Sequence, residues 1–89
     1  MKILVIGSNS FSGSNLINIL LNHGYDVIGV SRSDEYHEIF LPYKNNSRIK
    51  NFKFYKFNLN FDNKKIASLI KKEKIKIIFN FAAQGEVRS

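Results

Sequence analysis

The residues most suited to binding chemistry form the segment GSNSFSG, at positions 7–13. This segment follows the apolar run KILVI of residues 2–6, and a new apolar pattern with helical spacing begins at Leu16. A helix that starts in such a loop offers main-chain N–H groups without intrahelical partners, together with a partial positive charge. Small side chains let a large anion reach these groups. The segment therefore predicts a loop that binds phosphate or pyrophosphate.

The spacing of the small residues matches both ends of the pattern G-x-x-G-x-x-G, with Gly7 and Gly13 as the outer glycines and Ser10 in the middle position. We expect Gly7 to make the tight turn out of the strand, and Gly13 to let the helix pack closely against it. Ser10 is small enough to let a pyrophosphate approach, and its hydroxyl adds a donor. The alternative is a loop whose glycines serve turn geometry alone.

Composition limits the other classes of function. The 89 residues suffice for one small domain, and the lack of cysteine excludes disulfides and thiolate metal sites. The two histidines, His23 and His37, stand in no cluster with metal-ligand spacing, so we predict no metal site. No apolar run is long enough for a secretory or membrane-spanning segment, and we expect a cytoplasmic protein without a membrane partner.

The formal net charge of +7 raises the question of a nucleic-acid partner. The lysines are scattered over residues 44–76 among asparagine and isoleucine, and several have the spacing of one helix surface. We interpret them as a solvated helix face and expect no nucleic-acid binding. A mildly positive field that attracts an anionic cofactor is the alternative functional role.

Strand and helix patterns alternate along the chain. Four strands are predicted, over residues 2–7, 25–32, 52–59 and 76–83. Helices are predicted over residues 14–24, briefly within residues 33–42 and after Asp62, and residues 43–51 are expected to form a polar loop. This alternation predicts an α/β fold in which flanking helices cover a parallel sheet with strand order 3-2-1-4. Ligands are expected outside the carboxyl ends of the strands, near the switch point between the first and fourth strands.

The second predicted strand ends in VSRS, at residues 30–33, without an acidic residue at its tip. An acid there would pair with a ribose 2′-hydroxyl and favour NAD. Arg32 can instead bind a 2′-phosphate, assisted by the hydroxyls of Ser31 and Ser33, which favours NADP over NAD. Asp34 follows shortly after and keeps NAD as an option. The alternative for Arg32 is that it is only a surface residue at the start of the next helix.

Three segments together resemble the extended short-chain dehydrogenase/reductase family, the NAD(P)-dependent nucleotide-sugar epimerases and dehydratases. They are the opening ILVIGSNSFSGSNL, the stretch NLNFDNKKIASLI, which is similar to a D-L-x-D segment, and NFAAQGEVRS, which is similar to an LAAQ segment. The AAQ ending and Arg32 favour members that resemble GDP-mannose 4,6-dehydratase. The resemblance implies that residues 1–89 are the N-terminal part of an NAD(P)-binding Rossmann domain, truncated after the fourth strand.

The resemblance also implies a role for each matching position. The glycine loop would hold the pyrophosphate through Gly7, Ser10, Phe11 and Gly13. Arg32 would hold the adenosine end, the adenine would meet Asn58 and Leu59, and the nicotinamide-side ribose would lie against Ala82, Ala83 and Gln84. Two positions depart from the family pattern. Ser10 replaces a glycine, and Asn58 replaces an aspartate. The Asn58 side-chain oxygen can still accept a hydrogen bond from the adenine amino group, but it lacks the negative charge of a carboxylate.

The chemistry of the family uses a Tyr-x-x-x-Lys pair that this chain lacks. The residues four positions after its tyrosines are Gly29, Phe40, Ser47 and Leu59. We therefore predict no catalytic residue and no turnover by these 89 residues alone. The chain is then either the cofactor half of a nucleotide-sugar dehydratase or epimerase, or a stand-alone non-catalytic module that binds or senses NAD(P). An uncovered edge beside the fourth strand predicts an associating species, such as a homo-oligomer.

Overall fold

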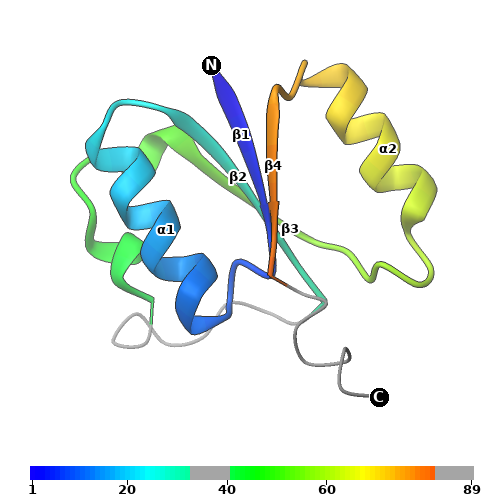
Figure 1. Cartoon of the computed structure of the whole chain (residues 1–89), viewed down its shortest axis with the longest axis horizontal. Coiled ribbons are helices and arrows are strands. Elements are labelled where there is room, and N and C mark those ends of the chain that lie inside the picture. The colour runs from blue at the N-terminus through cyan, green and yellow to red at the C-terminus, as the bar shows by residue number, and fades with distance from the viewer. Residues whose placement is uncertain (33–40, 82–89) are drawn as a thin grey trace.

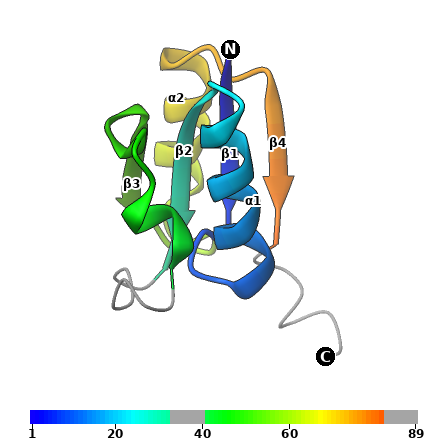
Figure 2. The same cartoon turned by 90° about the vertical axis from the view of Figure 1, so that its left-hand side faces the viewer.

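The parallel sheet predicted from the alternating patterns is confirmed in the computed structural model, which describes residues 1–32 and 41–81. In chain order the elements are β1 (Lys2–Ile6), α1 (Phe11–Asn22), β2 (Asp26–Ser31), the 3₁₀ turns η2 (Pro42–Asn45) and η3 (Ile49–Asn51), β3 (Phe52–Lys56), α2 (Asn63–Lys72) and β4 (Ile77–Asn80). The four strands pair in parallel in the order β3-β2-β1-β4, and Figure 2 shows them side by side. The fold is therefore Rossmann-like, with the predicted strand order.

The sheet is covered on both faces, by α1 and η2 on one side and by α2 on the other (Figure 1). Because side chains alternate along a strand, the apolar run of β1 supplies both interfaces. Ile3 and Val5 belong to the cluster around α1, whereas Leu4 and Ile6 belong to the cluster around α2. Double coverage explains why β1 is apolar from Ile3 to Ile6.

The segment of residues 43–51, expected to be a polar loop, is more structured than that expectation. Pro42 begins a 3₁₀ turn, in which Tyr43 is fully buried with its ring centroid 4.5 Å from that of Phe52. Asn46 Nδ2 donates to Asn18 Oδ1 at 2.8 Å, which ties the segment to α1. The polar composition of the segment did not indicate that a single tyrosine would anchor it. The short helix predicted within 33–42 falls largely on residues outside those described.

The edge strand β4 carries apolar side chains that remain exposed. Ile77, Ile78 and Phe79 are 38%, 47% and 36% exposed, respectively. Within residues 1–32 and 41–81, β1 is the only strand paired with β4. This agrees with the uncovered edge that the sequence predicted beside the fourth strand.

An ion pair at the amino end of the sheet links the start of β1 to the end of α2. Lys2 Nζ donates to Glu73 Oε1, and Glu73 is the C-cap residue of α2. The hydrogen bond between them raises the pKa of Lys2 and lowers the pKa of Glu73. Desolvation acts in the opposite direction on each pKa, but its effect is smaller. The folded state therefore favours both charged forms.

These two shifts predict a stability profile with two limbs. Because the pKa of Glu73 is lowered on folding, its contribution is present above the pKa of an unfolded glutamate and is lost as pH falls through the folded value. Because the pKa of Lys2 is raised, its contribution is present below the pKa of an unfolded lysine and is lost as pH rises through the folded value. Urea midpoints measured across pH should show both losses. Glu73→Gln should flatten part of the acid limb, and an unchanged acid limb in that variant would contradict the assignment.

Candidate functional site

The glycine loop leaves β1 in a conformation that suits glycine. Gly7 has φ +88°, in the left-handed region that side chains disfavour. The amides of Gly7 and Ser8 both donate to the carbonyl oxygen of Val30, at 2.7 and 3.2 Å. These bonds hold the turn against the end of β2, as the tight turn predicted for Gly7 requires.

Gly13 lies where the loop and the first turn of α1 approach most closely. A Cβ atom at Gly13 would lie 2.3 Å from the carbonyl oxygen of Gly7 and 2.9 Å from Ser10 Oγ. The nearer neighbour is main chain and cannot rotate away. We expected a glycine at position 13 because it lets the helix pack closely against the strand. The structure has this close approach.

Ser10, at the middle position of the pattern, is the N-cap of α1. Its Oγ accepts from the Gly13 amide at 2.9 Å and donates to the Gly7 carbonyl oxygen at 2.8 Å. We expected this hydroxyl to be an additional donor for a ligand. In the structure its hydrogen is used within the loop, because the Gly7 carbonyl lies within reach. The serine that replaces glycine thus joins the two outer glycines.

The N–H groups of Phe11 and Ser12, in the first turn of α1, donate no hydrogen bond to the described residues. Ser10 N donates to Gly7 O and Gly13 N to Ser10 Oγ, whereas the Phe11 and Ser12 amides have no acceptor within residues 1–32 and 41–81. The first turn of α1 contains no acidic residue. The Phe11 side chain is 85% exposed, and the main-chain amide of the same residue is the group that suits an anion. Two adjacent free amides at a helix N-terminus, beside closely packed glycines, fit a pyrophosphate.

Ser12 was absent from the residues predicted for the site. The signal that identifies it is its place directly after the capping serine and the first helical residue, where N–H groups have no intrahelical acceptor. The side chain of Ser12 gives no indication that its main-chain N–H would be free to bind a ligand.

Arg32 follows β2 beside the glycine loop. Val30 pairs with Ile6 in the register of β1 and β2, and it also accepts from the first two amides of the loop. Arg32, two residues further along, is exposed. The structure thus brings the guanidinium-bearing residue and the glycine loop to the same edge of the sheet.

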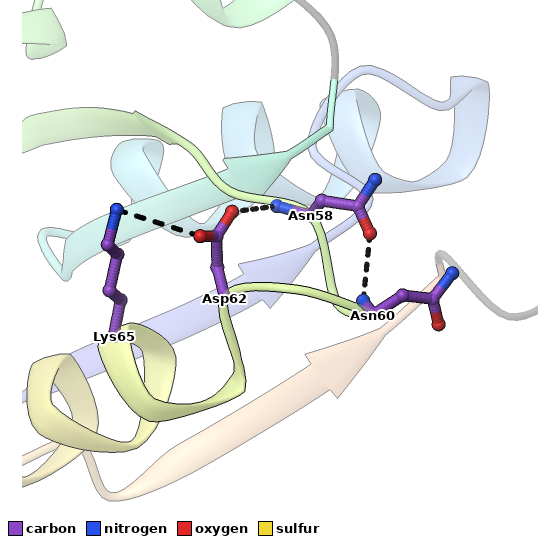
Figure 3. A network of polar contacts seen from close by, with 4 residues as sticks. All are labelled: Asn58, Asn60, Asp62 and Lys65. Atoms are coloured by element: carbon purple, nitrogen blue, oxygen red, sulfur yellow. Dashed lines mark hydrogen bonds and ion pairs between the residues drawn. The ribbon is translucent and has the colours of Figure 1, made fainter.

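The next strand end carries Asn58 in a network of polar contacts (Figure 3). The Asn58 amide donates to Asp62 Oδ2 at 2.7 Å, and Asn58 Oδ1 accepts from the Asn60 amide at 2.8 Å. Lys65 Nζ lies 3.6 Å from Asp62 Oδ1. Asp62 is the N-cap residue of α2, which begins after Asp62 as predicted. Its side chain makes no capping bond because it faces the Asn58 amide.

Leu59 and the end of β4 complete this edge. The Leu59 side chain packs against the core cluster around α2, so its main chain is the part left for a ligand. The Phe81 amide donates to the Ile6 carbonyl oxygen at 2.7 Å, which places the end of β4 beside the start of the glycine loop. Ala82, Ala83 and Gln84 lie outside the described residues.

Two other kinds of feature, a membrane-spanning helix and a metal site, are absent from residues 1–32 and 41–81. Neither helix is long and apolar enough to cross a bilayer. No group of three or more His, Cys, Asp and Glu residues is placed to hold a metal ion.

The parallel sheet, the glycine loop and the polar strand ends define a Rossmann-like nucleotide-binding domain of the kind found in extended short-chain dehydrogenases/reductases. Residues 4–89 match the family described as GDP-mannose 4,6 dehydratase, and the chain belongs to that family. It is 35% identical over 91 residues to Protein CapI of Staphylococcus aureus, covering 99% of this chain and 27% of that protein.

Solved structures of two enzymes are similar in fold and sequence. The dTDP-glucose 4,6-dehydratase of Bacillus anthracis, in complex with NAD, matches 96% of this chain and 27% of its own with TM-score 0.75 and 25% identity. The UDP-glucose 4-epimerase of Thermotoga maritima, with UDP-glucose, matches 94% of this chain and 25% of its own with TM-score 0.72 and 28% identity. The chain thus spans about a quarter of the length of these relatives.

Proposed function

We propose that this chain is the dinucleotide-binding N-terminal part of an NAD(P)-dependent nucleotide-sugar dehydratase or epimerase. The observation that carries the proposal is the pair of free amides on Phe11 and Ser12, at a helix start that Gly7 and Gly13 allow to lie close to the sheet. Family membership supports the substrate class. When bound, the nicotinamide cofactor would supply redox chemistry, taking a hydride from the carbon that bears a sugar hydroxyl while that hydroxyl loses its proton, and later returning the hydride.

Each strand end has a proposed part in holding the cofactor. The main chain at Phe11 and Ser12 would bind the pyrophosphate, and the caps and turns made by Gly7, Ser10 and Gly13 would keep those amides in place. Arg32 would hold the adenosine end. The adenine would lie against Asn58 and the main chain of Leu59, and the nicotinamide-side ribose would contact Ala82, Ala83 and Gln84.

We propose NADP as the preferred cofactor, with NAD as the alternative. Arg32 is exposed directly beyond β2, and a guanidinium there can bind a 2′-phosphate through two parallel hydrogen bonds. The structure of the Bacillus anthracis relative contains NAD, and this keeps NAD in consideration. The proposal also includes a cytoplasmic location.

Within this proposal residues 1–89 bind the cofactor and do not transfer the hydride, because no tyrosine is followed by lysine at the spacing that the family uses. Isothermal titration calorimetry on the folded chain tests the binding role. We expect saturable 1:1 binding, about tenfold tighter for NADP⁺ than for NAD⁺, which corresponds to one additional charge-assisted interaction. Folded protein that gives no heat with either cofactor would overturn the proposal. Turnover of GDP-mannose by the chain alone would contradict the purely binding role.

A further inference from the structure

The main chain and the side-chain oxygen of Asn58 are already engaged within the loop that follows β3. The Asn58 amide donates to Asp62 Oδ2, and the Asn58 carbonyl oxygen accepts from the amides of Phe61 and Asp62 at 3.1 and 2.7 Å. The side-chain Oδ1 accepts from the Asn60 amide at 2.8 Å. A main-chain N–H can meet only an acceptor, so this contact identifies the amide oxygen and sets which way the Asn58 side chain is turned.

The unused hydrogen-bonding capacity of Asn58 is therefore mainly that of a donor. Within residues 1–32 and 41–81, Nδ2 has no acceptor, and it is turned away from Asn60 in Figure 3. The side chain offers two N–H hydrogens against one remaining lone pair on Oδ1. An aspartate at this position could accept the same Asn60 hydrogen bond, but it would present an ionised acceptor in place of the NH₂ group.

Purines differ in the group at position 6 that such a side chain would meet. Adenine has an amino group there, which donates, whereas a 6-keto purine has an oxygen, which accepts. We infer that Asn58 reads the base of the dinucleotide as a hydrogen-bond donor, so that this chain takes a 6-keto purine dinucleotide at least as readily as the adenine form. The inference rests on the proposed function, which places the base beside Asn58.

The network around Asn58 strengthens this selection because it leaves the amide little freedom to turn over. Rotating the amide by 180° would bring Nδ2 to the Asn60 N–H and leave two donors facing each other. The donor is thus held in place before any ligand arrives, and this lowers the entropic cost of using it.

The test compares NAD⁺ with nicotinamide hypoxanthine dinucleotide, two probes that differ at position 6 of the base. Calorimetry on the 89-residue chain should give a dissociation constant for the hypoxanthine form equal to or below that for NAD⁺. In Asn58→Asp, which keeps the acceptor for the Asn60 amide, the preference should move toward NAD⁺ by at least about tenfold, as expected for a charge-assisted hydrogen bond. Asn63→Asp makes the same chemical change at an exposed residue of α2 and should leave the ratio unchanged.

The possible outcomes separate this inference from the function on which it rests. If both probes bind, with NAD⁺ tenfold tighter in both the wild type and Asn58→Asp, donor readout is wrong while the dinucleotide site stands. If neither probe binds to folded protein, the proposed function fails and the inference with it.

A measurement on the wild type covers the case of a variant that does not fold. The side-chain NH₂ resonances of Asn58 should shift in ¹⁵N NMR spectra on addition of the hypoxanthine dinucleotide, and a bound state without that shift would overturn the inference.

Discussion

Gly13→Ala should lose dinucleotide binding by more than about a hundredfold and destabilise the fold by about 3 kcal/mol, the upper part of the usual range for overpacking a closed site. The added methyl group would lie 2.3 Å from the Gly7 carbonyl oxygen, so either the helix start or the strand end must move. Moving either one displaces the Phe11 and Ser12 amides, which belong to the first turn of α1. Gly13→Val should be at least as severe, because valine adds two further methyl groups at the same place.

Urea unfolding and calorimetric titration with NADP⁺ measure these two effects separately. Ile19→Val provides the control, because it places a valine at a half-exposed position of the same helix, away from the loop. We expect the control to bind as the wild type does. Binding of NADP⁺ by Gly13→Ala within threefold of the wild type would show that the close approach of Gly13 to Gly7 is not required for the site.

Arg32→Glu should reverse the cofactor preference. Replacing a cation by an anion removes charge-assisted hydrogen bonds to the 2′-phosphate, each worth about 1.5–3 kcal/mol, and adds repulsion. We expect NADP⁺ binding to weaken by about a hundredfold. NAD⁺ binding should be retained or improved, because a carboxylate can accept from the free ribose 2′-hydroxyl.

Titration of both cofactors against the variant measures the change in ratio. Lys76→Glu is the matched control, since it makes the same change of charge at an exposed residue directly before β4, at the amino end of the sheet. A general loss of positive potential would weaken NADP⁺ binding equally in both variants. Equal NADP⁺ binding by Arg32→Glu and the wild type would disprove the assignment of the 2′-phosphate to this residue.

The lysine-rich composition belongs mainly to exposed surface in the described structure. Lys64, Lys65, Lys71 and Lys72 are all exposed on α2, while Ile66 and Leu69 of the same helix are buried against the sheet. This is the amphipathic arrangement that the sequence analysis predicted for the helix after Asp62. The positive charge therefore requires no nucleic-acid partner to explain it.

Local patterns in the sequence were sufficient to predict the strands, both long helices, the order of the sheet and the positions of Gly7 and Gly13. Such features follow from periodicity, turn chemistry and the handedness of crossovers, which neighbouring residues in the chain largely determine. The left-handed φ of +86° at Gly24, after α1, follows the same kind of local rule, because glycine most readily adopts this conformation at the end of a helix.

The tertiary structure alone decided how the polar atoms are paired. Ser10 turns its hydroxyl toward Gly7, Asp62 turns from its own helix to the Asn58 amide, and Asn58 Oδ1 accepts from Asn60. Tyr43 is buried because α1, β2 and β3 meet around it, although the residues that follow it in the sequence are polar. A residue type states only which hydrogen bonds a side chain is able to make. The partners within about 3 Å, brought there by the packing of separate elements, determine which bonds form and which groups remain for a ligand.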